Sequence, residues 1–119
     1  MRQLLFICLI ALPTQTTAQP YSESMADCAA VFQNAAQWVT TDTSADELMA
    51  VAVRWADAAV RQAEQEGAGT SEDAIWEEID AKTAEWEAKG RAVFFTQDFR
   101  DWSQYCRKFA DHTGAEIYQ

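Results

Sequence analysis

Two cysteines, Cys28 and Cys106, carry the clearest chemistry in this sequence of 119 residues. They lie far apart along the chain, whereas a redox-active dithiol typically has its cysteines close together, as in a CxxC motif. An even number of cysteines in an exported chain usually forms structural disulfides, because the compartment is oxidising. We therefore predict a structural disulfide between them, which in the chain-entropy model stabilises the fold by roughly 4 kcal/mol.

The expectation of export rests on the start of the sequence. One arginine precedes the apolar run Leu4–Leu12, and Pro13 with a polar stretch of small residues follows it. This order is typical of a secretory signal peptide, and the run is shorter than the roughly 20 residues that span a bilayer. We predict a signal peptide over 1–18 and a secreted or periplasmic mature chain, 19–119, that forms one domain. The third cysteine, Cys8, is lost with the signal.

The mature chain has few groups suited to catalysis, because His112 is its one histidine. A Ser-His-Asp triad would depend on this single residue in a terminal turn, and zinc or copper sites need more histidine or free cysteine than is present. The sequence also has no glycine-rich phosphate loop and no EF-hand spacing. We therefore expect no enzymatic activity, no metal site and no cofactor.

One pair of residues leaves a cofactor open as an alternative. Met25, near the start of the mature chain, and His112, near its end, would face the same end of a helical bundle. This pair resembles the ligands of periplasmic cytochromes of the b562 type, and the resemblance implies a non-covalently bound haem. The chain departs from that family in its predicted disulfide and its five tryptophans.

The chain is strongly acidic, with 19 Asp and Glu residues against 9 Lys and Arg residues and a net charge of -10. Such a surface repels phosphate backbones and excludes sequence-independent binding of nucleic acid. Nine of the acids lie between Glu64 and Glu87, with Lys82 as the one basic residue there, whereas 89–108 is mildly basic. The acidic segment either keeps the domain soluble or docks a partner with a basic surface.

Tryptophan is also in excess, and two of the five lie at the margins of predicted helices. Marginal tryptophans are typical contacts for a partner or ligand, although they also pack under loops. With the acids of the same region, they make up our predicted partner contacts, which are Trp38, Trp76, Glu72, Asp73, Glu77, Glu78 and Asp80.

Apolar residues at three- and four-residue steps predict the elements that must position these groups, four helices and no strand. The expected ranges are 24–39, 44–66, 71–89 and 91–112. Capping patterns place the first three starts at Ser24, Ser44 and Thr70, and glycines place the ends of the last three at Gly67, Gly90 and Gly114. The second helix has two apolar stripes, so we interpret it as the central helix, with a stripe exposed for a partner as the alternative.

The last helical segment carries both a heptad-spaced apolar face and a capping pattern near Gln97, where Thr96 or Asp98 can start a new helix. The residues of that face are Phe95, Phe99, Trp102, Cys106 and Phe109. In an up-down bundle the first and last helices are antiparallel neighbours, which brings the two cysteines to the same end. We predict an all-α fold, a small four-helix bundle-like domain whose first and last helices are clamped by one disulfide.

Three functions are compatible with these features. We favour an exported, non-enzymatic protein that acts through protein–protein interaction, as an inhibitor, immunity-type or accessory factor. The second is an acid-responsive holdase, because the chain resembles acid-activated periplasmic chaperones in general layout. Neutralising its acids would leave the mature chain with a net charge of +8, or +9 with His112 protonated. The third is a haem or small-molecule carrier.

Overall fold

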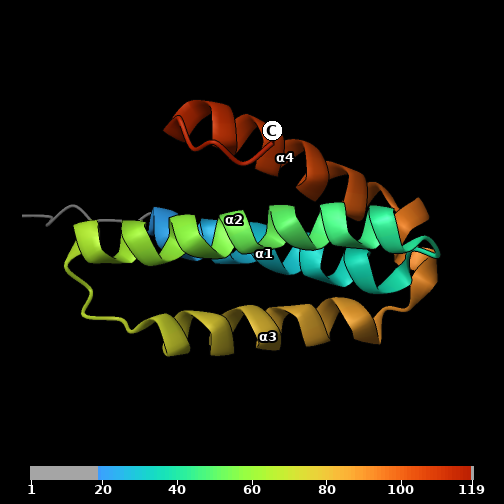
Figure 1. Ribbon diagram of the computed structural model, residues 1–119, viewed down its shortest axis with the longest axis horizontal. Coiled ribbons are helices and arrows are strands. Elements are labelled where there is room, and N and C mark those ends of the chain that lie inside the picture. Colours follow the sequence, from blue (N-terminus) through green and yellow to red (C-terminus); the bar gives the residue numbers. More distant parts are fainter. Residues whose placement is uncertain (1–18, 119) are drawn as a thin grey trace, which may run out of the picture.

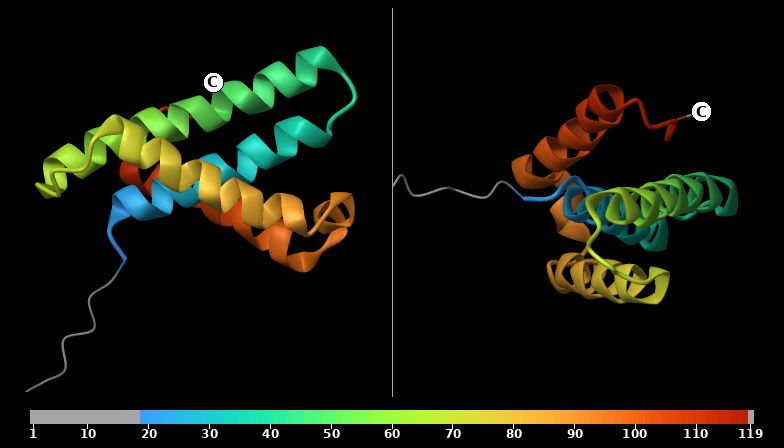
Figure 2. Two further views of the ribbon diagram at one scale, coloured as in Figure 1. Left: turned by 90° about the horizontal axis from the view of Figure 1, so that it is seen from below. Right: turned by 90° about the vertical axis from the view of Figure 1, so that its left-hand side faces the viewer.

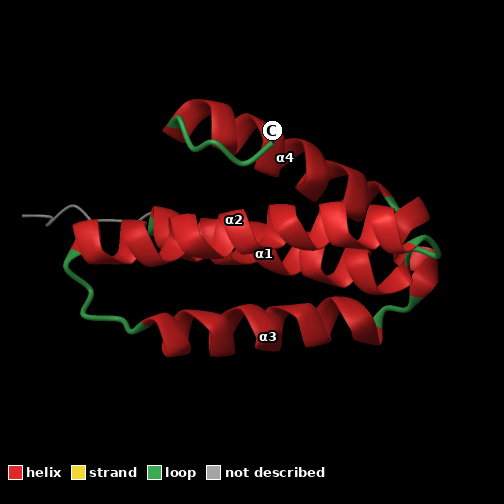
Figure 3. Ribbon diagram, viewed as in Figure 1, coloured by secondary structure: helices red, strands yellow, loops and turns green. Residues whose placement is uncertain are grey.

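The computed structural model describes residues 19–118, so the predicted signal peptide over 1–18 lies outside the described residues. Within that range the chain forms four α-helices and one short 3₁₀ helix, with no strand (Figure 3). The elements are α1 (Tyr21–Trp38), α2 (Asp42–Glu66), α3 (Glu72–Ala88), η1 (Arg91–Phe95) and α4 (Gln97–Thr113). The predicted all-α fold is confirmed. None of these helices is long and apolar enough to cross a bilayer.

The helices alternate in direction and lie in three tiers (Figures 1 and 2). α1 and α2 form an antiparallel pair, α3 covers one side of this pair, and α4 crosses its opposite side. α1 contacts each of the other three helices, and eleven of its 18 residues are buried, against six of the 25 in α2. The central helix is therefore α1, which corrects our interpretation of α2.

The composition of α1 explains its central place. Most of its buried residues are small, and they are spread around the helix rather than along one stripe. Small side chains let neighbouring helices approach closely from several directions, because the distance between helix axes depends on the side chains at the contact. α2 carries larger apolar residues but also a charged edge, and Val53 on its second stripe is 38% exposed. α2 therefore packs mainly against α1 and leaves most of this edge in solvent.

The Cys28–Cys106 disulfide is present and joins α1 to α4, as predicted. The two Cα atoms are 5.7 Å apart, and both side chains are fully buried. The bond therefore belongs to the core and fixes α4 against the central helix.

Three helix ends follow the predicted capping chemistry. Thr96 Oγ1 accepts a hydrogen bond from the backbone N–H of Phe99 at 3.3 Å, and α4 begins at Gln97. Gly67 and Gly114 end α2 and α4 in the left-handed conformation, with φ angles of 68° and 71°. Glycine adopts this conformation without a steric penalty, which is why α2 and α4 end at these two positions.

The predicted starts of the first three helices are wrong by one to three residues. α1 begins directly after Pro20, so Ser24 lies inside the helix and is buried, and Ser44 likewise lies within α2. α3 is capped by Ser71 rather than Thr70, since the Ser71 Oγ accepts the backbone N–H three residues later at 3.2 Å. α1 and α2 begin without a side-chain capping hydrogen bond, so the hydroxyl patterns at Ser24 and Ser44 do not mark their starts.

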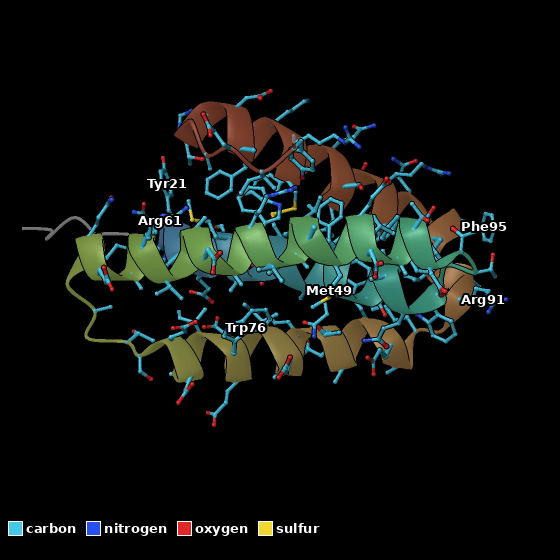
Figure 4. All side chains as sticks on the ribbon, in the orientation of Figure 1. Tyr21, Met49, Arg61, Trp76, Arg91 and Phe95 are labelled. Atoms are coloured by element: carbon cyan, nitrogen blue, oxygen red, sulfur yellow. A yellow bond between two sulfur atoms is a disulfide. The ribbon has the colours of Figure 1, made fainter. Side chains whose placement is uncertain are left out.

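Phe95 is wrongly placed in the predicted apolar face of the last segment. It belongs to η1 and is 79% exposed. Its side chain points outwards into solvent, at the end of the molecule where η1 connects α3 to α4 (Figure 4). The 3₁₀ turn changes the rotation per residue, so that Val93 instead faces the core and is buried. The later members of the face behave as predicted, because Cys106 and Phe109 are buried within α4.

The chain after Gly114 contributes to the core, which the sequence did not indicate. This C-terminal tail turns back between α4 and the α1–α2 pair (Figures 1 and 2). Ile117 is 2% exposed, and its carbonyl oxygen accepts a hydrogen bond from Arg54 Nη1 at 3.0 Å. The Tyr118 ring packs edge-on against Trp55, which is fully buried. The tail therefore fills the space that the oblique crossing of α4 leaves open.

We predict that Ile117→Ala lowers the free energy of unfolding by about 2–5 kcal/mol, because it leaves a cavity between the tail and the core. Denaturant unfolding of the oxidised protein measures this change. The matched control is Val53→Ala, which removes an exposed apolar side chain and should change stability by about 0.5 kcal/mol or less. Equal effects of the two substitutions would show that the tail does not contribute to the core.

Candidate functional site

A cleft of about 180 Å³ lies between α3 and α4, with α1 contributing one wall. It combines charged groups from three helices with two indole rings. Its lining residues are Asp27, Lys82, Glu85, Trp86, Lys89, Asp98 and Trp102. We call this site the α3–α4 cleft. The connection through η1 brings the two helices together at one end, and the α1–α2 pair separates them towards the other (Figure 1).

The inner part of the cleft holds an ion pair between α3 and α1. Lys82 Nζ lies 2.5 Å from Asp27 Oδ1 and 3.8 Å from Glu78 Oε1. The Lys82 and Asp27 side chains are only 24% and 16% exposed, so water screens the pair weakly. Burial alone would lower the pKa of Lys82, but the hydrogen bond and negative charge of Asp27 prevail and raise it. Lys82 is therefore a fixed cation.

Asp27 is also held from the other side. The side-chain amide of Gln19, the residue at which the mature chain is predicted to begin, donates to Asp27 Oδ2 at 2.9 Å and to Ser24 Oγ at 3.1 Å. Both carboxylate oxygens of Asp27 thus have a partner. This carboxylate therefore positions Lys82.

The outer part of the cleft holds a second lysine in a weaker arrangement. Lys89 Nζ lies 4.7 Å from the centre of the Trp86 ring and 3.5 Å from Asp98 Oδ2. The Lys89 and Asp98 side chains are 52% and 57% exposed, so this ion pair contributes about 1 kcal/mol or less to stability. The Trp86 ring face and the Asp98 carboxylate together form a binding position for one cation, which we call the seat. Lys89 of the chain itself occupies this position.

The aromatic walls of this seat are rigid. Trp86 is 9% exposed and meets Phe99 edge-on, with ring centres 6.2 Å apart, and Phe99 in turn meets Phe94 at 4.8 Å. Trp102 on the opposite wall packs edge-on against Tyr105 at 5.6 Å. Rings that are fixed by their neighbours present their faces without loss of side-chain entropy on binding.

The lining of the α3–α4 cleft is chemically suited to a cation. Carboxylates and indole faces attract ammonium and guanidinium groups, and indole is the best of the aromatic surfaces. Its lining residues include no serine, cysteine or histidine. Within residues 19–118 no group of three or more His, Cys, Asp or Glu side chains is placed to hold a metal ion.

The predicted acidic contacts lie in different surroundings. Glu78 lies beside Lys82 at the edge of the cleft, where burial, together with the negative charges of Glu23 and Asp27, raises its pKa despite Lys82. Asp80 lies on the other flank of α3 and accepts a hydrogen bond from Gln33 at 3.3 Å. The remaining three, Glu72, Asp73 and Glu77, are exposed to solvent.

The two predicted marginal tryptophans lie apart from each other and outside the α3–α4 cleft. Trp38 ends α1, where its Nε1 donates to Asn34 Oδ1 at 3.1 Å and the Arg91 guanidinium lies 5.6 Å from its ring centre. Trp76 is in the first half of α3, partly buried, and faces the α1–α2 pair (Figure 4). The cleft is instead lined by Trp86 and by Trp102, which belongs to the apolar face predicted for the last helical segment.

Met25 and His112 lie on neighbouring turns at one end of α1 and α4 but are engaged separately. Met25 is 4% exposed and belongs to the core cluster. His112 is exposed, and its Nε2 lies 3.1 Å from the Tyr21 hydroxyl, with the two ring centres 6.1 Å apart. The nitrogen that would ligate iron is thus occupied by Tyr21, and the methionine sulfur is enclosed by packing.

Comparison with models of protein families, with curated proteins and with solved structures finds no match to this chain. The function must therefore be argued from the geometry of the α3–α4 cleft and from the chemistry of its residues.

We predict that the Lys82 ammonium titrates above its ordinary value of 10.5 and that Asp27→Asn lowers its pKa, because burial then acts with less opposing charge. The contribution of the ion pair to stability is present below pH 10.5 and is lost as the pH rises through the folded pKa. The substitution should lower the free energy of unfolding at neutral pH by about 1–3 kcal/mol.

Side-chain NMR of the three lysines follows this titration directly. Asp98→Asn is the matched control, since it removes a carboxylate from the exposed pair and should leave the pKa of Lys82 unchanged. An unaltered Lys82 titration in Asp27→Asn would contradict the assigned pair.

Proposed function

We propose that this chain is an exported, non-enzymatic protein that binds a partner protein, as an inhibitor, immunity-type or accessory factor, and that the α3–α4 cleft receives a basic side chain of that partner. The observation that carries the proposal is the seat formed by Trp86 and Asp98. A cation already lies in it, supplied by Lys89. The arrangement of ring and carboxylate therefore suits a cation.

Replacement of Lys89 by a partner's side chain is energetically feasible. The internal ion pair is exposed and weak, so releasing it has a small free-energy penalty. An arginine of the partner would gain more than the lysine loses, because a planar guanidinium stacks on an indole and pairs with a carboxylate through two parallel hydrogen bonds. Glu85 and Trp102 line the same cleft and extend the surface available to it.

The charge of the whole chain supports the same class of partner. With a net charge of -10, the protein attracts basic surfaces over long range and repels acidic ones. The disulfide, and the absence within residues 19–118 of a helix able to span a bilayer, are compatible with the proposed export. Export itself rests on the signal-like pattern of residues 1–18.

We predict that the double substitution Glu85→Gln with Asp98→Asn weakens binding of the partner about tenfold, because it removes the negative charge of the seat. The measurement is recovery of one stoichiometric partner when the mature, oxidised protein is used as bait in its native envelope fraction, followed by titration of that partner in purified form.

The matched control is Glu72→Gln with Asp73→Asn, which changes the net charge equally at the exposed start of α3. Specific loss in the cleft variant supports the proposal. An equal loss in both variants would mean that only net charge matters, and no loss in either would exclude the cleft.

An acid-responsive holdase is the second candidate, and it is favoured by a carboxylate that ties two helices together. Glu66 at the end of α2 accepts hydrogen bonds from the Ser22 backbone N–H at 3.2 Å and from the Ser22 hydroxyl. Burial opposes ionisation, but these bonds and one from Gln62 together prevail and hold the pKa of Glu66 below its usual value. Protonation would release α1 from α2 at this point.

For this candidate we predict that acid loosens the helices while the disulfide still links α1 to α4. The stabilising contribution of Glu66 is present above pH 4.5 and is lost as the pH falls through its lower folded pKa. Near-UV circular dichroism should therefore be lost at about pH 2–3, with client proteins protected from aggregation. The stability difference between wild type and Glu66→Gln should shrink over the same interval. Retained tertiary structure at this pH, without protection of client proteins, would exclude the holdase function.

A further inference from the structure

A second and larger groove, of about 660 Å³, lies between α2, α4 and the C-terminal tail. It shares no lining residue with the α3–α4 cleft. Its volume falls within the range of about 300–1,000 Å³ that is usual for small-molecule sites. Its principal lining residues are Phe32, Leu48, Val51, Arg54, Arg107 and Tyr118. We call it the arginine groove, after the two arginines among them.

The two arginines are gathered at the tail end of the groove. Arg54 Nη1 donates to the carbonyl oxygen of Ile117, and the Arg107 guanidinium lies 5.2 Å from the ring centre of Tyr118. Ile117 and Tyr118 are adjacent, so both guanidiniums are held near the same short piece of tail. Within residues 19–118 neither forms an ion pair, although the chain has 19 acidic residues. Each guanidinium has five N–H donors, and a carboxylate matches their geometry.

The rest of the groove is mainly apolar. Leu48 and Val51 lie one turn apart on α2, and Phe32 of α1 lies beside them. Glu47 lines the same groove but precedes Arg54 by seven residues, a distance of about 10 Å along the helix axis. An anionic group is therefore attracted at the arginine end and repelled at the Glu47 end.

We propose that the arginine groove binds a single-chain amphiphile with a carboxylate head, such as a fatty-acid anion. The head pairs with Arg54 and Arg107, and the hydrocarbon chain lies along Leu48, Val51 and Phe32. A hydrocarbon chain needs no hydrogen-bond partners, whereas a peptide would bring an N–H and a C=O for every residue onto a surface that is mostly apolar between the arginines and Glu47. The site is independent of the partner proposed for the α3–α4 cleft.

Calorimetric titration of the mature, oxidised protein with dodecanoate below its micelle concentration tests this proposal. We expect saturable binding of one molecule, weakened about fourfold for each methylene removed in a series of shorter carboxylates. Dodecanol and dodecylammonium should bind at least about tenfold more weakly, because neither offers the negative charge and the paired oxygens of a carboxylate. Equal binding of all three head groups would overturn the proposal.

Two pairs of variants test the two ends of the site. Arg107→Gln should weaken dodecanoate binding about tenfold, whereas Arg100→Gln, which removes an exposed arginine of α4 outside the groove, should not. Val51→Ser should weaken it, whereas Val53→Ser, on the exposed stripe of α2, should not. Near-UV circular dichroism confirms that each variant is folded. Loss of binding in the control variants, or none in the groove variants, would overturn the assignment.

Discussion

The covalent link between Cys28 and Cys106 is the constraint on which the α3–α4 cleft and the arginine groove, our two proposed binding surfaces, both depend. α1 packs closely along α2, but α4 crosses this pair obliquely and diverges from it (Figure 1). The disulfide holds α4 in that position from within the core. On one side of the link the divergence of α4 from α3 opens the α3–α4 cleft. On the other side the space beneath α4 is filled by the C-terminal tail, which supplies the end wall of the arginine groove.

The two surfaces show how one acidic chain can offer opposite chemistry at two places. In the cleft, lysines are neutralised by carboxylates, and the aromatic rings and remaining acids favour a cation. In the groove, Arg54 and Arg107 line an apolar surface and have no carboxylate partner within residues 19–118. Net charge therefore sets long-range attraction, whereas local pairing sets the chemistry that each proposed site offers.

Much of the fold could be predicted from the sequence, because it depends on local rules. Helical periodicity, a hydroxyl at Thr96 and glycines at Gly67 and Gly114 act within one turn of chain. The α3–α4 cleft and the arginine groove could not be predicted, because they join residues that are distant in sequence. Nothing near Asp27 signals its pairing with Lys82, and the tail after Gly114 has no periodicity that would place Ile117 in the core. The 3₁₀ turn also shifted the phase of the heptad pattern, which turned Phe95 outwards.

The position of the disulfide also determines how the molecule responds to mechanical force. Tension applied at the two ends of the described chain passes through the link, so the loop from Cys28 to Cys106, with all of α2 and α3, bears none of it. Only the first turns of α1, the end of α4 and the tail can be drawn out. A pulling partner, or a motor that threads the chain from an end, could peel off Tyr118 and Ile117 while most of the helical body kept its shape.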